Sequence, residues 1–525
     1  FALEALQHLI GDPHYDCAPL VEHFLVRPIS PDFLFAHALV RDGVYSSLLS
    51  ARRKDLHRAA ADWFLEQDSV LYAEHLDRAE DPRAAAAYLD AAKAQVGQFH
   101  YERAGTLAKR GLEIAGDAAT RYALTCLHGD VLRELGENDL SIDAFQDALD
   151  AAADDGQRAA AWIGQAEGMR IVDRLDDALA ALDKAQQAAG DDAGELTRIH
   201  YIRGNLYFPL GNVDGCLEQH ELALKFARQA GSVEDEARAL GGLGDAYYQR
   251  GRMMTAFEHF HRCVELSHEH DFGRIAVANL SMVGFSRQYL LELPQALENG
   301  HEAVETAVRV GHRRAELLGR HLVFSILFDT GDIDLAAEQL AEAETIIERL
   351  GTRRFEAQNL CFEAKVARVR GQRAEAVRIN QQALVICRET GAGFLGPRVI
   401  GEIALSADDP ALQQKALQDG EILLKEPSVY HNHFHFNRDA MSVCLDRQDW
   451  DEVERYAAAL EDVTRPEPLP WCDFYIARGR ALAAFGRGQR DDALIDELRR
   501  LRDEAGRAEL NIALPELDAA LAETS

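Results

Sequence analysis

The chain has 525 residues, of which 47% are apolar, so it is long enough to bury a large core. Acidic residues outnumber basic ones by 88 to 56, for a formal charge of −32, and no basic block interrupts this excess, which argues against nonspecific nucleic-acid binding. The eight cysteines are scattered as reduced thiols are, and no apolar run approaches the roughly 18 residues that span a bilayer, so we expect a cytoplasmic protein without a membrane segment.

Residues 1–80 are predicted to form a small module of their own. Four prolines separate short elements before a long helical stretch: Pro13, Pro19, Pro28 and Pro31. Strands are expected almost nowhere in the chain, because its composition is that of long helices. The first residue, Phe1, is not a natural initiation site, and we expect the chain to be the C-terminal piece of a longer protein.

Within this module, the segment Phe33–Phe64 contains F-x-H-x-L, Y-x-x-L and R-R-x-x-L-H pieces in order. It resembles the end of the winged-helix part that follows the nucleotide-binding core in STAND-type signalling ATPases. The matching residues are Phe35, His37, Leu39, Tyr45, Leu48, Leu49, Arg52, Arg53, Leu56 and His57. The resemblance implies that His37, Arg52 and Arg53 help to sense a bound nucleotide; a buried histidine and a solvated basic helix face are the alternative.

Residues 81–515 show an internal period of about 40 residues. Small or short residues recur at Ser141, Ala178, Cys216, Ala256, Ala296, Ala336, Ala376, Ala416, Val453 and Ala493. A second small residue stands twelve positions earlier in several repeats, at Gly129, Ala166, Gly204, Gly244 and Gly284, and turn glycines follow at Gly136, Gly211, Gly251, Gly331, Gly371 and Gly488. Two antiparallel helices approach closely only where small residues face each other, so each repeat is predicted to be a helix–turn–helix unit.

The stretches "GNLYFPLGNVDGCLEQHELAL" from Gly204 and "GDAYYQRGRMMTAFEHFHRCV" from Gly244 resemble the tetratricopeptide repeat, in a longer variant similar to the arrays of large signalling ATPases. The match is partial, since Gly300 and Asn380 stand where an aromatic residue is usual. The predicted fold is therefore an all-α, right-handed α-solenoid of about ten to eleven helix pairs. Its first pair, between Ala86 and Leu112, is expected to be incomplete, and residues 516–525 are expected to form a C-terminal tail.

Such a superhelix has a concave groove, which the resemblance assigns to the first helix of each pair. The groove positions of the central repeats carry Tyr201, Asn205, Phe208, Asp245, Tyr248, Gln249, Gln288, Tyr289, Phe328, Asp329 and Arg368. Aromatic, amide and carboxylate side chains in this mixture suit a peptide or a sugar-like ligand. The same aromatic spacing also fits packing between repeats.

No catalytic or cofactor motif is present. The phosphate-binding G-x-x-x-x-G-K-[ST] loop is missing, and "GGLGDAYYQRG" from Gly241 is explained by helix packing. His431 and His435 are spaced as metal ligands on a helix are, but no neighbouring ligand completes a tetrahedral set there or at His259, His261, His268 and His270. We therefore expect no enzyme activity, cofactor or metal.

Three functions remain open. The preferred one is the sensor and partner-binding arm of a STAND signalling ATPase, linked to a class III nucleotide cyclase, whose groove holds a protein, a peptide or a small inducer and which acts on its own ATPase domain. The second is the inducer-binding domain of a transcription activator of the maltose-regulon type. The third is a free-standing tetratricopeptide-repeat adaptor.

Overall fold

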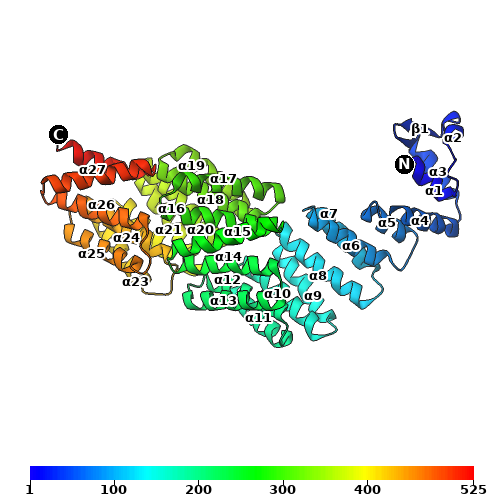
Figure 1. Ribbon diagram of the computed structural model, residues 1–525, viewed down its shortest axis with the longest axis horizontal. Helices are drawn as coiled ribbons and strands as arrows, with labels where there is room; N and C mark the ends of the chain where they lie inside the picture. Colours follow the sequence, from blue (N-terminus) through cyan, green and yellow to red (C-terminus); the bar gives the residue numbers. More distant parts are fainter. Residues whose placement is uncertain (525) are drawn as a thin grey trace. The chain divides into compact units, whose positions relative to one another are not determined.

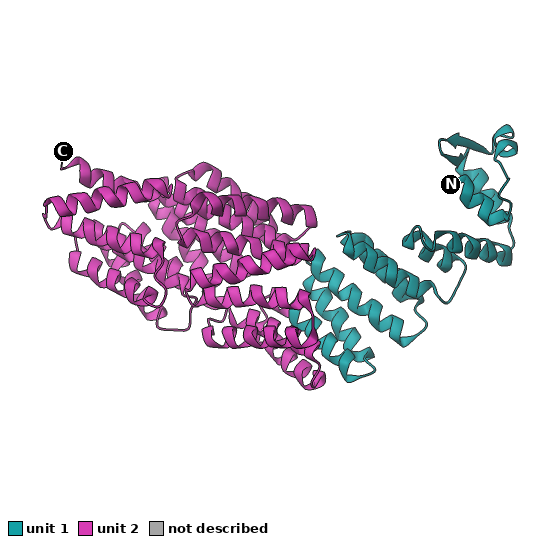
Figure 2. Cartoon of the chain, in the orientation of Figure 1, with its two compact units in different colours: residues 1–168 teal, residues 169–525 magenta. Residues whose placement is uncertain are grey.

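A computed structural model describes residues 1–524 of the chain, and Ser525, the last residue of the expected tail, lies outside the described residues. The described residues contain 28 α-helices, one two-stranded sheet and one 3-10 helix. They divide into two compact units, residues 1–168 and 169–525, coloured separately in Figure 2. The division falls within helix α10 (Asp155–Ile171). The boundary at residue 80 that the sequence suggests stays a prediction.

The first unit begins with short elements around a β-hairpin (Figure 1). Strands β1 and β2 pair antiparallel, with Val26 opposite Phe35. This hairpin is the one sheet among the described residues, which agrees with the expectation of almost no strands, and the resemblance to a winged-helix module stays a prediction. The elements are α1 (Leu3–Ile10), α2 (Ala18–Glu22), β1 (Val26–Ile29), β2 (Asp32–Phe35), α3 (Ala38–Ser47), α4 (Ser50–Phe64) and α5 (Ser69–Arg78).

Eleven consecutive helix pairs follow, from α6 with α7 to α26 with α27. The first pair is complete, so the expectation of an incomplete pair there is wrong. The helices before the division are α6 (Ala84–Gly97), α7 (Tyr101–Ile114), α8 (Ala118–Leu135) and α9 (Asn138–Ala151).

The second unit contains the remaining pairs and a closing helix. Its helices are α11 (Leu175–Ala189), α12 (Ala193–Tyr207), α13 (Val213–Ala230), α14 (Val233–Gln249), α15 (Met253–Glu269), α16 (Gly273–Tyr289), α17 (Leu293–Val310), α18 (Arg313–Thr330), α19 (Ile333–Leu350), α20 (Arg353–Val369), α21 (Arg373–Thr390), α22 (Gly396–Ser406), α23 (Pro410–Leu423), α24 (His431–Asp446), α25 (Trp450–Thr464), α26 (Pro470–Gly486), α27 (Asp492–Arg507), η1 (Asn511–Ala513) and α28 (Leu514–Ala522). Most of the expected tail therefore belongs to α28, whose Leu517 is fully buried.

Small residues set the close packing within each pair, as the repeat pattern predicts. A Cβ atom built on Gly244 would lie 2.5 Å from the ring of Phe260, four residues after the small residue of the same repeat. Phe145 and His220 take the same position against Gly129 and Gly204. All ten recurring small residues lie on the second helix of a pair or at its start, and nine are buried; Ala493 is exposed, and its neighbour Leu494 is buried instead.

The turn glycines have the backbone conformation that the pattern requires. All six have φ between 70° and 94°, the left-handed region in which a Cβ atom is strained. At Gly331, for example, this conformation ends α18, and the glycine N–H bonds the Phe328 carbonyl. These six turns therefore follow their first helices where the sequence places them.

The superhelix of the second unit closes on itself. Three pairs of residues, each 181 positions apart, come into contact: Asp173 with Arg354, Gln249 with Tyr430, and Thr330 with Asn511. A regular separation of this size means that the array completes one turn in about four and a half repeats. Helix α26 consequently packs on α16, and a cavity that is partly open to solvent lies between successive turns.

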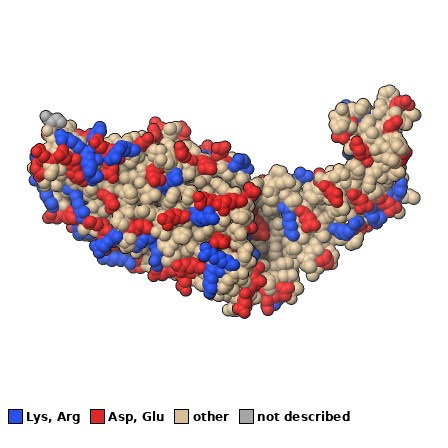
Figure 3. Space-filling model, viewed as in Figure 1, with Lys and Arg blue, Asp and Glu red and all other residues tan. Residues whose placement is uncertain are grey.

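Among residues 1–524, no helix combines the length and the apolar character needed to cross a membrane. On the face shown in Figure 3, acidic and basic side chains alternate without a large basic area.

Candidate functional site

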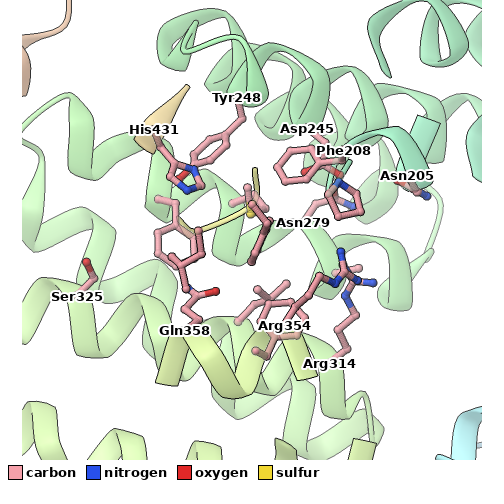
Figure 4. Close-up of a pocket in the computed structure, with 18 of the residues that line it drawn as sticks. Asn205, Phe208, Asp245, Tyr248, Asn279, Arg314, Ser325, Arg354, Gln358 and His431 are labelled. Atoms are coloured by element: carbon pink, nitrogen blue, oxygen red, sulfur yellow. The ribbon is translucent and has the colours of Figure 1, made fainter. Parts of the chain in front are cut away.

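A cavity of about 280 Å³ inside the second unit combines aromatic and charged side chains (Figure 4). Its walls come from the first helices of successive pairs, the even-numbered helices from the end of α10 to α24. Because repeats one superhelical turn apart face each other, residues from α12 and α14 lie opposite residues from α20 and α22. The lining residues include Arg170, Tyr201, Asn205, Phe208, Asp245, Tyr248, Asn279, Met282, Phe285, Gln288, Tyr289, His312, Arg314, Ser325, Arg354, Phe355, Gln358, Phe394, Arg398, His431 and His435.

Seven of the eleven expected groove residues line this cavity, namely Tyr201, Asn205, Phe208, Asp245, Tyr248, Gln288 and Tyr289. Three others, Phe328, Asp329 and Arg368, line a second cavity of about 380 Å³ nearer the C-terminal end of the unit. The two cavities meet at Gln288, whose side-chain amide donates a 2.7 Å hydrogen bond to the Asp329 carboxylate. In the second cavity, Arg368 pairs with the fully buried Glu402 at 2.5 Å.

The eleventh residue, Gln249, lines neither cavity. Its side chain is fully buried and donates to the Phe208 carbonyl at 3.0 Å, and its own backbone carbonyl accepts from the Tyr430 N–H at 2.9 Å. Gln249 therefore joins neighbouring turns of the superhelix.

Two of the aromatic residues serve packing as well as lining. Tyr248 is 7% exposed and Tyr289 3% exposed, and their rings meet edge to face. The Tyr289 ring also packs against Phe434 and Trp471, and its hydroxyl lies 3.1 Å from Nε2 of His435. The packing alternative, which the sequence left open, applies strongly to Tyr289.

Arginines form the positively charged part of the cavity, and sequence reasoning missed them. Arg314 and Arg354 extend from α18 and α20 toward the side on which Asp245 and Phe208 lie (Figure 4). Arg354 Nε is 2.6 Å from Oδ1 of Asp173, and both of these side chains are about nine-tenths buried. Arg314, in contrast, is an exposed residue that lines the cavity.

A repeat signal marks these arginines. Arg-Arg pairs stand at 313–314 and at 353–354, one 40-residue period apart, at the start of two successive first helices. The expected groove positions lie in the later turns of each first helix, whereas these arginines lie in the first turn.

Burial changes the protonation of the cavity side chains. It raises the pKa of the Asp245 carboxyl to about 7, although the charges of Arg314 and Arg170 oppose the change. Burial also lowers the pKa of His431 and that of His312 to about 3, so both imidazoles are neutral at pH 7. The cavity histidines therefore add no positive charge beside the arginines.

The residues expected to sense a nucleotide lie in the first unit. His37 precedes α3 and is exposed, which removes the alternative of a buried histidine, and Arg52 is exposed on α4. Arg53 lies over the ring of Tyr45 at 5.4 Å, and the Tyr45 hydroxyl is 2.9 Å from Nε2 of His57. Their role in sensing stays a prediction.

The histidines considered as metal ligands are placed differently. His431 and His435 are buried in the cavity wall with ring centroids 6.5 Å apart, whereas His261 is exposed and lies near Glu265. Within residues 1–524, no three His, Cys, Asp or Glu side chains gather as a metal site would require.

Comparisons with known proteins place the fold. No family model matches the chain. The tetratricopeptide repeat protein 36 homolog of Drosophila pseudoobscura pseudoobscura is 35% identical over 108 residues, which are 20% of this chain and 56% of that protein. The chain thus spans little more than half the length of this curated relative.

Two solved structures are similar. A Rap protein complexed with Competence and Sporulation Factor has a TM-score of 0.52 and 12% identity, over 66% of this chain and 98% of that chain. The STAND protein with a tetratricopeptide repeat sensor, PH0952 from Pyrococcus horikoshii, has a TM-score of 0.47 and 14% identity, over 73% of this chain and 60% of that chain, a likeness too distant to support an inference. With its eleven helix pairs, the chain has an α-solenoid fold of the tetratricopeptide-repeat type.

Proposed function

We propose that the chain is a non-catalytic sensor and protein-interaction scaffold that holds its ligand in the cavity between Asp245 and Arg354. In this proposal it is the repeat arm of a multidomain signalling ATPase linked to a nucleotide cyclase. The resemblance of Phe33–Phe64 to the end of a STAND winged-helix part supports the ATPase link.

The observation that carries the proposal is the position of the cavity between two turns of one superhelix. Its walls come from α12 and α14 on one side and from α20, α22 and α24 on the other. A ligand that contacts both sides binds most tightly to one spacing of the turns. Binding therefore shifts the population of the superhelix toward that spacing, which is how a signal reaches an attached domain.

The size of the cavity favours a small ligand. A volume of about 280 Å³ is close to the lower end of the range for small-molecule sites, roughly 300–1,000 Å³. It admits a small molecule or the end of a peptide, while a folded partner would use the outer helices. The Rap protein that shares the fold is itself complexed with a factor, which supports a ligand-binding role.

A thermal-shift screen of the full chain tests this proposal. Metabolites, sugars, nucleotides and short peptides are compared on the wild type and on Ala278→Phe, which fills the cavity without changing its charge. A ligand at a hundredfold excess over its Kd should stabilise the wild type by about 2.7 kcal/mol and should leave Ala278→Phe unchanged. Leu335→Phe, on the exposed face of α19, is the matched control and should respond as the wild type does.

If no compound distinguishes the wild type from Ala278→Phe, the cavity is not the ligand site. The link to an ATPase has its own test in the parent protein. Removing residues 169–525 should change the rate of nucleotide turnover, and an unchanged rate with and without ligand would contradict the sensor role.

A further inference from the structure

The cavity carries an excess of positive charge in an acidic protein. Four arginines line it, at positions 170, 314, 354 and 398, and Asp245 is the single carboxylate among the lining residues. The chain as a whole has a net charge of −32. The acidic composition of the chain therefore does not explain why four arginines line this cavity. Their concentration here indicates a requirement for positive charge in the cavity itself.

Arg314 and Arg354 are close enough to repel each other. Burial, with the Arg354 charge, lowers the pKa of the Arg314 guanidinium. Asp173 compensates Arg354 at 2.6 Å, whereas no carboxylate of residues 1–524 lies within ion-pair distance of Arg314. An anion placed beside Arg314 would relieve this repulsion and would form charge-assisted hydrogen bonds.

Rings hold the two guanidinium groups in place. The Arg314 guanidinium lies 5.8 Å from the centre of the Phe355 ring, and that of Arg354 lies 5.7 Å from the centre of the Phe394 ring. Stacking of this kind limits the rotamers of a long side chain, so less conformational entropy is lost when an anion binds.

Arg398 supplies a further buried cation at the cavity wall. It is 8% exposed, its Nε has no hydrogen-bond partner among the described residues, and it forms no ion pair with them. Its guanidinium lies over the ring of Phe362 at 5.1 Å. Apolar surface from Met282, Phe285 and Phe394 also lines the cavity, so a ligand would meet rings and arginines together.

We propose that the cavity binds a small organic anion, a phosphate or carboxylate joined to an apolar or aromatic body, with Arg314 and Arg354 holding the anionic group. This inference rests on the proposed function and names the ligand class of the same site. The aromatic walls cover the ligand body, and the anion takes over part of the role of Asp173 at Arg354. The ligand thereby reaches the ion pair that joins two turns of the superhelix.

Isothermal titration of the full chain with four probes of one shape tests the inference. Phenyl phosphate and benzoate carry the charge, benzyl alcohol is the neutral analogue and benzylamine is the cationic one. At least one anion should bind more than roughly tenfold more tightly than the neutral analogue, and the cation should not bind. The comparison of phenyl phosphate with benzoate decides between a phosphate and a carboxylate.

Variants locate the binding. Arg314→Gln, which breaks no ion pair, should weaken anion binding roughly tenfold or more while leaving the melting temperature close to that of the wild type. Arg354→Lys keeps the charge opposite Asp173 and should weaken binding through loss of the forked geometry. Arg378→Gln, on the exposed face of α21, removes the same charge outside the cavity and should bind as the wild type does.

Equal binding of the neutral and anionic probes, unchanged affinity in Arg314→Gln, or no binding of either anion would each overturn the inference. A neutral ligand that is lost in Ala278→Phe would overturn it and leave the proposed function standing. The absence of any ligand sensitive to Ala278→Phe would overturn both.

Discussion

Asp173 and Arg354 form a 2.6 Å ion pair although they are 181 residues apart in the chain. The pair joins the start of the second unit to a helix one full superhelical turn later. Because both side chains are about nine-tenths buried, each depends on the other for charge compensation. The same pair stands beside the cavity, which links the closure of the superhelix to the candidate ligand site.

Breaking this pair should destabilise the second unit. Asp173→Asn leaves Arg354 without its partner and should cost about 3–5 kcal/mol, while the double variant Asp173→Asn with Arg354→Gln should cost less than the sum of the single variants. Chemical denaturation followed by circular dichroism measures the four proteins of this cycle. Additive effects of the two substitutions would contradict an energetic coupling between the turns.

Tyr289 should behave as a core residue. Tyr289→Ala removes a ring that packs against Phe434 and Trp471, and should cost about 3–5 kcal/mol. Tyr289→Phe keeps the ring, loses only the hydroxyl contact with His435, and should cost about 1 kcal/mol. Thermal melts of both variants decide the point, and a small effect of the alanine variant would assign Tyr289 to the ligand instead.

His220 should make the protein sensitive to acid. Burial lowers the pKa of this imidazole to about 3, whereas in the unfolded chain it titrates near 6.5. Between these values only the unfolded state binds the proton, so stability falls as the pH drops below about 6.5, by at most about 1.4 kcal/mol per pH unit.

The repeat itself supplies the matched variant. Phe145 and Phe260 occupy the same repeat position as His220, so His220→Phe fits a site of the kind that already holds phenylalanine. The melting temperature of His220→Phe minus that of the wild type should increase steadily as the pH is lowered from 7 to 5. A difference that does not change with pH would show that His220 is not buried in its neutral form.

Asp245 should have the opposite effect on stability. Burial raises the pKa of its carboxyl to about 7, so between pH 4 and pH 7 the folded state holds a proton that the unfolded chain has lost. This group therefore favours folding at low pH, and its contribution declines as the pH rises to 7. The charged or titratable groups that interact with it are Arg170, Arg314, Tyr201, Tyr248, Cys216 and Cys263.

Asp245→Asn removes the titration with little change of shape. The stability of the variant minus that of the wild type should be larger at pH 8 than at pH 5. At pH 8 the variant should also bind the anionic probes more tightly than the wild type does. Melting temperatures at the two pH values test the first effect, and titration calorimetry tests the second. A gain that is equal at both pH values would show that Asp245 is ionised throughout this range.

The local structure followed from the sequence to a large extent. Gly204 and Gly244, twelve residues before their partner small residues, correctly indicate where helices of a pair meet, because the pattern reflects contacts between neighbours in the chain. In the last repeat, the buried position is Leu494 and not the predicted Ala493. A pattern of single residues therefore locates a buried position only to within one residue.

The closure of the superhelix did not follow from the sequence. It depends on a small rotation at each repeat, summed over 181 residues, and no short pattern encodes that sum. The candidate site could not be predicted from the sequence for the same reason. Arg354 contacts Asp173 only because the superhelix closes, and it contacts Phe394 only because of the loop between α21 and α22. A search for charge at the repeat period would have found Arg314 and Arg354, but not the burial of Arg354.

Hydrogen–deuterium exchange of the full chain, with and without saturating phenyl phosphate, tests the central claim most directly. A ligand held between the turns should slow exchange in α14, α18 and α20 together, and Arg314→Gln should abolish the effect. Slower exchange confined to the second helices α17, α19 and α21, or no change under conditions in which calorimetry shows the ligand bound, would contradict a binding site inside the superhelix.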